Sequence, residues 1–263
     1  MIKWIDTIKY KIRFSDQGDG AVIVILHGYL ESIETFDAIA CDLSKSARII
    51  CIDLPGHGES DLKQDHVSVE DMADAVYAVI QHLNTHPIHL IGHSMGGYVA
   101  LAFADKYAHN LASFTFMHSS ANADTEDKRA NRAREIEFIR KGKKELICST
   151  AIPNTFSTKN QEAFSDVIDA LIDIASRTKD EGIIAALNAM MIRQDRNKIL
   201  RELSVPKYSF IGKEDNFIPF EKGVDWAHNN GMKPFVFEHS GHMSFIEEKE
   251  KCIAAVQSIL ADL

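Results

Sequence analysis

Short apolar runs recur along the chain and alternate with segments of helical periodicity. The run at residues 21–28 is continuous and ends at a glycine, as expected of a strand buried on both faces of a mostly parallel sheet. Residues 1–10 alternate apolar with polar positions, which also favours a strand. Further strand-like runs occupy residues 48–54, 88–91, 114–117, 207–211 and 234–237, and helical spacing is found at 69–83, 98–107 and 253–263. The alternation predicts a doubly wound α/β sheet.

A predominantly helical insertion interrupts this alternation after residue 119. Fourteen of the residues in 124–145 are charged, and helical stretches around 164–175 and 183–191 follow without a strand between them. Ligands bind beyond the carboxyl ends of the strands in an α/β sheet, so an insertion at that edge can cover the site as a lid. We therefore expect a core domain of residues 1–119 and 190–263 and a helical cap of residues 120–189.

Composition and charge narrow the classes of partner. The 263 residues include 29 Lys plus Arg and 38 Asp plus Glu, and the formal charge of −9 disfavours nucleic acids and lipid headgroups as partners. No stretch approaches the ~20 apolar residues of a membrane span, and the first residues do not follow the pattern of a signal peptide. Four cysteines are scattered without paired spacing. We expect a soluble, cytoplasmic protein with reduced thiols; its oligomeric state stays open.

The clearest chemical signal is Gly92-His93-Ser94-Met95-Gly96, which lies between the strand at 88–91 and the helix at 98–107. This is the Gly-x-Ser-x-Gly nucleophile elbow in a strand–turn–helix context. A tight turn holds the serine in strained backbone geometry, and glycines on either side remove side chains that would collide. The pattern predicts Ser94 as a nucleophile at the start of a helix, where the dipole favours negative charge.

A serine hydroxyl needs a base to take its proton and a carboxylate to orient that base. We expect His242, in the loop after the last strand, to be the base, with His239 as the competing histidine. Asp215, directly after the strand at 207–211, is the expected acid. The rival carboxylates are Asp124, Glu214 and Asp53.

Backbone amides are expected to form the oxyanion hole. The Met95 N–H and the Tyr29 N–H, the latter in the loop after the strand at 21–28, are the predicted donors. Three further histidines adjoin glycines, and we expect them to hold loops through hydrogen bonds rather than to react: His27, His57 and His93.

Taken together, these segments resemble the α/β-hydrolase fold family. The matching segments are Leu26-His27-Gly28-Tyr29, Asp53 to Ser60, Gly92 to Gly97, Asp215 and Gly241-His242. The resemblance implies an eight-stranded, mostly parallel sheet with one antiparallel strand near its start, a two-amide oxyanion hole and a variable cap. It also implies a catalytic triad of Ser94, Asp215 and His242. A serine at the elbow disfavours the haloalkane dehalogenase and epoxide hydrolase branches, which need a carboxylate there.

These residues predict a carboxylic-ester hydrolase that acts on a small-molecule ester through an acyl-enzyme on Ser94. The mechanism needs no metal and no organic cofactor, and the chain lacks the glycine–lysine and His-Glu-x-x-His motifs of nucleotide and zinc sites. Two alternatives stay open. One is a thioesterase or carbon–carbon bond hydrolase with the same triad, and the other is a non-catalytic ligand receptor on the same fold.

The insertion bears on substrate choice. Its charged segment, residues 124–145, is consistent either with an anion-binding lid or with a solvated helix stabilised by i, i+4 ion pairs. Five apolar residues are candidates for an acyl pocket, although ordinary contacts between cap and core explain them equally well: Phe138, Phe156, Phe164, Met190 and Met191.

Overall fold

A single eight-stranded sheet forms the centre of the protein. The structure, a computed structural model, describes residues 1–63 and 66–262. The strands are β1 (Ile2–Asp6), β2 (Lys11–Gln17), β3 (Val22–Leu26), β4 (Arg48–Ile52), β5 (Ile88–His93), β6 (Leu111–Met117), β7 (Lys207–Gly212) and β8 (Lys233–Phe237). Their order is β1-β2-β4-β3-β5-β6-β7-β8, and only the pairs that include β2 are antiparallel. The predicted architecture is thus confirmed.

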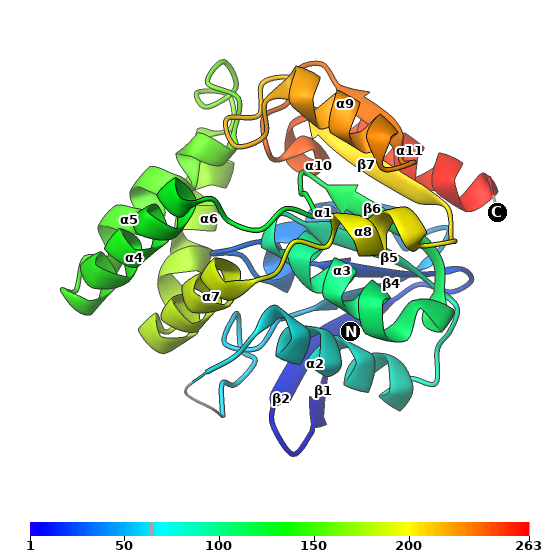
Figure 1. The fold of residues 1–263 in the computed structure, drawn as a ribbon, viewed down its shortest axis with the longest axis horizontal. Coiled ribbons are helices and arrows are strands. Elements are labelled where there is room, and N and C mark those ends of the chain that lie inside the picture. The colour runs from blue at the N-terminus through cyan, green and yellow to red at the C-terminus, as the bar shows by residue number, and fades with distance from the viewer. Residues whose placement is uncertain (64–65, 263) are drawn as a thin grey trace.

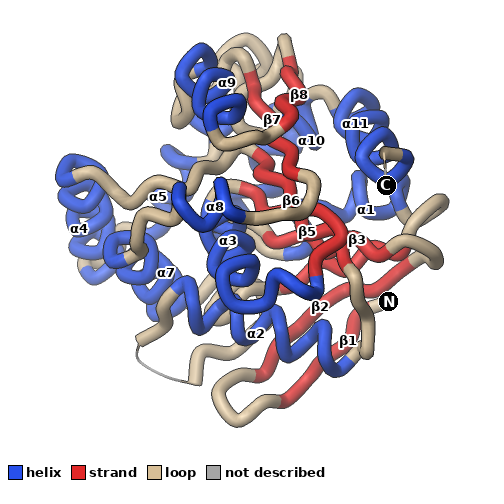
Figure 2. The backbone as a smooth tube through the Cα atoms, turned by 45° about the vertical axis from the view of Figure 1, so that its right-hand side comes forward, coloured by secondary structure: helices blue, strands red, loops and turns tan. Residues whose placement is uncertain are grey.

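Helices cover both faces of this sheet (Figures 1 and 2). On one face lie α1 (Asp37–Leu43) and α11 (Lys249–Ala261), and on the other lie α2 (Val69–His82), α3 (Met95–Tyr107), α8 (Asn197–Glu202) and α9 (Phe220–Asn229). The short α10 (Ser244–Glu247) precedes α11. Residue 263, the last position of the predicted terminal helix face, lies outside the described residues. The core between the layers is aliphatic and aromatic, with Phe14, Phe114 and Phe210 fully buried.

Of the helices between β6 and β7, four gather beside the sheet, on the left of Figure 1. They are α4 (Glu126–Arg140), α5 (Lys144–Ala151), α6 (Ser165–Arg177) and α7 (Asp180–Ile192). Helix α4 contacts α5 and α7, and α5 contacts α6. Within residues 1–63 and 66–262, none of the helices combines the length and the apolar character that a membrane span requires.

Strand β2 lies outside the strands that the hydrophobic pattern predicts, because two of its buried residues are charged. Arg13 is 5% exposed, and its Nε donates to Asp53 Oδ2 at 2.5 Å. Its terminal nitrogens reach Glu34 at 2.7 Å and Glu59 at 3.0 Å. A buried charge is tolerated when it is paired in this way. The ion pairs tie the antiparallel strand to the loops after β3 and β4.

Removing the charge of Arg13 is expected to destabilise the fold. An Arg13→Met variant leaves the Asp53 carboxylate buried without its partner, a situation that costs about 3–5 kcal/mol. Arg177→Met is the control, because Arg177 pairs with Asp173 on the surface at 3.0 Å and such exposed pairs contribute less than about 1 kcal/mol. Urea unfolding of both variants measures the difference. Equal, small losses would contradict this account of β2.

Candidate active site

Ser94 occupies a sharply turned position between β5 and α3. Its backbone has φ 48° and ψ −114°, a conformation that residues other than glycine rarely adopt. A Cβ on Gly92 would lie 2.5 Å from Gly96 O, and a Cβ on Gly96 would lie 2.3 Å from Leu26 O. Only glycine therefore fits at these two positions. The turn sets the serine at the carboxyl edge of the sheet, as the elbow motif predicts.

A cavity of about 310 Å³ opens at this edge of the sheet. Ser94, His242 and Tyr29 all line it, together with residues of α4 and α7. In the part of the chain that the structure describes, the Ser94 hydroxyl has no hydrogen-bond partner. The backbone carbonyl of Ser94, by contrast, accepts a hydrogen bond from Ser119 Oγ at 2.7 Å. The structure thus brings the predicted nucleophile and base to one cavity.

Asp215 and His242 are directly hydrogen bonded. The Nδ1 of His242 lies 2.7 Å from Asp215 Oδ2, and the amides of Phe217 and Ile218 donate to Oδ1 at 2.7 and 3.1 Å. Burial acts to raise the pKa of Asp215, but the neighbouring His242 ring and a hydrogen bond from His118 outweigh it and hold that pKa well below its usual range. A carboxylate fixes His242 with Nδ1 as donor, which leaves Nε2 free to accept a proton.

The rival acid Asp124 is engaged elsewhere. Its carboxylate is fully buried, accepts from Arg132 Nε at 2.6 Å and lies 2.7 Å from Arg193 Nη1. These two guanidinium groups offset the effect of burial and lower the pKa of Asp124. The group is a neutralised structural anion, and it makes no contact with His242 among the described residues.

The other two rivals also have partners of their own. Asp53 pairs with Arg13, as described above, and Glu214 accepts from Ser157 Oγ and Lys159 Nζ, each at 2.5 Å. His239, the competing histidine, is exposed to solvent. The geometry therefore favours Asp215 and His242 over every alternative that the sequence left open.

Two backbone amides near Ser94 are free to bind an oxyanion. Within residues 1–63 and 66–262, neither the Tyr29 N–H nor the Met95 N–H has an acceptor. Met95 is the first residue of α3, where the amides of a helix lack internal partners. Next to Tyr29, the loop is held by Glu31, whose carboxylate accepts from the Gly28 N–H at 2.7 Å.

The histidines beside glycines take different roles. His27 contacts Gly28 O through Nδ1 at 2.8 Å, and its Nε2 accepts from Leu54 N at 2.9 Å. His93 lies between Glu31 and the carbonyl oxygen of His242, 3.0 Å from each. Both therefore hold loops, as predicted. His57 does not, because neither of its buried ring nitrogens has a partner in the described part of the chain.

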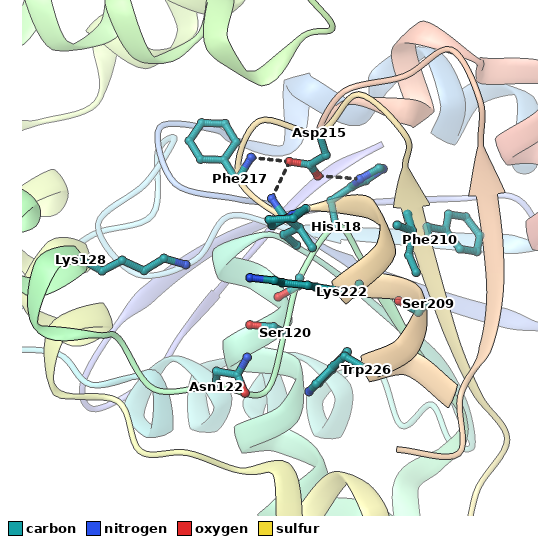
Figure 3. Close-up of a pocket in the computed structure, with 15 residues that line it drawn as sticks. His118, Ser120, Asn122, Lys128, Ser209, Phe210, Asp215, Phe217, Lys222 and Trp226 are labelled. Atoms are coloured by element: carbon teal, nitrogen blue, oxygen red, sulfur yellow. Dashed lines mark hydrogen bonds and ion pairs between the residues drawn. The ribbon is translucent and has the colours of Figure 1, made fainter. Parts of the chain in front are cut away.

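His118 is a site residue that the sequence analysis did not single out. It follows β6, has φ 51°, and is fully buried. Its Nδ1 lies 3.2 Å from Asp215 Oδ2 (Figure 3), and its Nε2 lies 2.7 Å from Ser244 Oγ. Its position in the sequence could have identified it, because a histidine directly after a parallel strand lies at the same edge of the sheet as the elbow.

The ligating atoms of His118, Asp215 and His242 lie within 4.8 Å of one another, a spacing that a metal ion can also use. The hydrogen bonds among the three residues account for this spacing here. The cluster is thus suited to holding the Asp215 carboxylate in one orientation, from two sides.

Of the five apolar pocket candidates, one lines the cavity beside Ser94. Met190 does so from α7. Phe138 is 42% exposed on the surface of α4, and Met191 is half-buried beside the core. Phe156 is fully buried, with its ring 5.9 Å from that of Phe164, so this pair fills space within the insertion. Phe156 and Phe164 thus serve in packing, the alternative given above, rather than in lining an acyl pocket.

Comparison with known proteins places this geometry among hydrolases. A family model described as the alpha/beta hydrolase fold matches residues 21–138. The chain is 28% identical over 214 residues to 3-oxoadipate enol-lactonase 1 from Acinetobacter baylyi, covering 80% of this chain and 77% of that protein. A malate-bound thermophilic esterase from Thermogutta terrifontis superposes with a TM-score of 0.94 at 29% identity, covering 100% and 98% of the two chains. An esterase from Exiguobacterium antarcticum shares the fold, with a TM-score of 0.89, 24% identity and coverage of 99% and 100%.

A pH experiment tests the environment of His118. Burial lowers its pKa from 6.5 to about 4, against the opposing effect of Asp215. Between these pH values the unfolded chain binds a proton that the folded chain does not, so acidification lowers the free energy of unfolding. A His118→Asn variant keeps a donor but cannot titrate. Its loss of stability from pH 6.5 to 4 should be shallower by up to about 1.4 kcal/mol per pH unit.

Urea unfolding of both proteins across that range makes the comparison. The difference in the free energy of unfolding at pH 8 gives the structural cost of the substitution. The change of this free energy with pH then measures proton binding by His118 alone. Parallel curves from pH 8 to pH 4 would show that His118 is not held neutral.

Proposed function

Because this chain belongs to the α/β-hydrolase fold family, we propose that it is a serine hydrolase that cleaves carboxylic esters through an acyl-enzyme on Ser94. The observation that carries the proposal is the 2.7 Å contact between Asp215 and His242 beside a strained serine in one cavity. A buried carboxylate, a histidine with a free Nε2 and an unbonded hydroxyl at a cavity are the groups that acyl transfer requires.

In the proposed mechanism, Ser94 Oγ attacks the ester carbonyl and passes its proton to Nε2 of His242. Asp215 stabilises the resulting imidazolium. The amides of Tyr29 and Met95 bind the oxyanion of the tetrahedral intermediate. His242 then gives its proton to the departing alcohol, and a water molecule activated by the same histidine hydrolyses the acyl-enzyme. Every step uses groups of this chain, the substrate and water.

In this proposal helices α4 to α7 form the cap, residues 120–189, over a core of residues 1–119 and 190–263. Arg132 and Glu135 of α4 line the cavity beside Ser94, as do Ala151 and Met190 of α5 and α7. These contacts support a role of the insertion in substrate choice. Helix α7 continues to Ile192, past the boundary proposed from the sequence.

The relatives support ester cleavage within the family. The Thermogutta protein is an esterase, and the Acinetobacter protein is named for a lactone, which is a cyclic ester. A small-molecule ester is accordingly the proposed substrate class. The same three residues can also catalyse thioester or carbon–carbon bond cleavage. Turnover rates on matched substrates distinguish these two reactions from ester cleavage.

Removing the nucleophile tests the proposal. A Ser94→Ala variant is expected to lose at least about 10³-fold in kcat on 4-nitrophenyl butyrate, because the acyl-enzyme no longer forms. Ser149→Ala, an exposed serine on α5, is the control and should retain activity. Circular dichroism establishes that both variants fold. The wild type should also show a higher kcat/KM on the ester than on the matched thioester or vinylogous diketone.

Two results would contradict the proposal. One is ester turnover that survives in a folded Ser94→Ala protein. The other is a wild type that binds esters without turnover, which would favour a ligand receptor on this fold.

A further inference from the structure

A second cavity adjoins the one that contains Ser94. It has a volume of about 260 Å³ and lies between the loop after β6 and helix α9. The two cavities share part of their lining, including His118, Ser120, Lys128 and Phe217. A substrate held at Ser94 can therefore extend from the catalytic cavity into this side cavity.

Two lysines from opposite sides reach into the side cavity. Lys128 comes from α4 and Lys222 from α9, and Figure 3 shows their ammonium ends directed toward the same space. Within residues 1–63 and 66–262, neither ammonium group has a hydrogen-bond or ion-pair partner. Asp215 also lines this cavity, but its carboxylate is already bound by His242, His118 and two amides. Two positive charges thus face the cavity without compensation.

Two neutral donors accompany the lysines. Asn122 Oδ1 accepts from Asn197 Nδ2 at 2.7 Å, and this bond turns the amide nitrogen of Asn122 toward the cavity, as Figure 3 shows. Ser120 lines both cavities, and its hydroxyl has no partner in the described part of the chain. Ammonium, amide and hydroxyl donors converging on one space form a set that suits a carboxylate.

The position of each lysine is unfavourable for its own helix. Lys128 and Lys222 both lie in the first turn, of α4 and α9 respectively, where the positive end of the helix dipole disfavours a cation. The same first turns carry acids that compensate the helix ends but do not line the side cavity: Glu126, Asp127 and Glu221. An anion placed between the two ammonium groups would relieve their unfavourable position.

The neighbouring arginines do not share this role. Arg132 and Arg193 both pair with the Asp124 carboxylate, and Arg134 donates to Asn131. The catalytic cavity also contains an acid, Glu135, which does not line the side cavity. In the catalytic cavity Glu135 lies beside Lys128 and Arg132, whereas the acid that lines the side cavity, Asp215, is already engaged. Negative charge on a substrate is therefore favoured most in the side cavity.

We propose that the side cavity binds a carboxylate carried by the ester substrate, held between Lys128 and Lys222 with Asn122 and Ser120 as further donors. This inference rests on the proposed function, since it assigns a substrate class to the same site. The enzyme then prefers esters that bear a carboxylate on one arm, a few bonds from the scissile carbonyl. The anion-binding lid considered from the sequence is replaced by a lysine pair, of which only one member belongs to the insertion.

Matched pairs of esters test the preference on each arm. For the acyl arm, the 4-nitrophenyl monoester of glutaric acid is compared with 4-nitrophenyl pentanoate. For the alcohol arm, the butyrate ester of 3-hydroxypropanoate is compared with propyl butyrate. In at least one pair, the wild type should show the higher kcat/KM for the carboxylate ester.

The lysine variants identify the source of that preference. In Lys128→Met/Lys222→Met, the ratio of kcat/KM for the charged and neutral esters should fall roughly tenfold, the effect of losing two partly exposed charges. Lys141→Met, which removes an exposed lysine just beyond the other end of α4, should leave the ratio unchanged. Because both lysines are exposed, the wild-type preference should also weaken as salt is added.

Binding to the Ser94→Ala protein separates this inference from the proposed function. Calorimetry with glutarate and pentanoate should show tighter binding of the dicarboxylate, lost in the double lysine variant. Lysine-dependent binding without ester turnover in the wild type would uphold the subsite and contradict the esterase. Turnover that favours the neutral ester in both pairs, or that keeps its charge preference in the double variant, would overturn the subsite and leave the esterase intact.

Discussion

The strained backbone at Ser94 is the constraint on which the rest of the candidate active site depends. A residue in this region costs on the order of 1–3 kcal/mol, so the surrounding structure must over-determine it. Strand β6 and the loop after it supply much of that restraint: the Ser94 N–H donates to Met117 O at 3.0 Å, and Ser119 Oγ donates to Ser94 O at 2.7 Å. The turn also brings α3 against the end of β3, which places the Tyr29 amide near the serine. One packing arrangement thus positions both the proposed nucleophile and the proposed oxyanion donors.

Paired buried charges order the loops around this turn. His93 has an acceptor at each ring nitrogen, Glu31 at Nδ1 and the His242 carbonyl at Nε2, so both nitrogens donate and the ring is an imidazolium. Burial acts to lower the pKa of His93, but the charge of Glu31 and its hydrogen bond outweigh it and raise that pKa. The pair joins the loop of Tyr29, the turn at Ser94 and the loop of His242. In the same way, the ion pair of Arg13 with Asp53 holds the loops after β3 and β4 in place.

Local sequence sufficed for the features that depend on one turn or one strand. The elbow glycines, the strand before them and the helix after them are all adjacent in the chain, so the sheet and the place of Ser94 could be predicted. Asp215 and His242 follow strands, which assigns them to one edge. The hydrophobic pattern did not predict strand β2 because its two buried charges depend on partners distant in the sequence, among them Asp53 for Arg13 and Arg48 for Asp16.

The other differences also arise from contacts distant in the sequence. The role of His118 depends on the neighbourhood of β6 and β7, which no spacing along the chain reveals. The pocket lining depends on how α4 to α7 fold over the edge, so Met190 faces the cavity whereas Phe156 and Phe164 pack within the insertion. The two lysines of the side cavity lie 94 residues apart and become a pair only in space.

The central claim is that Ser94 is an activated nucleophile, and labelling with a fluorophosphonate tests it without presupposing a substrate. Intact mass and peptide mapping of the wild type and Ser94→Ala give the readout. The account predicts a single adduct, located on Ser94 and absent from the variant. A folded wild type that stays unlabelled, or an adduct on another residue, would contradict it.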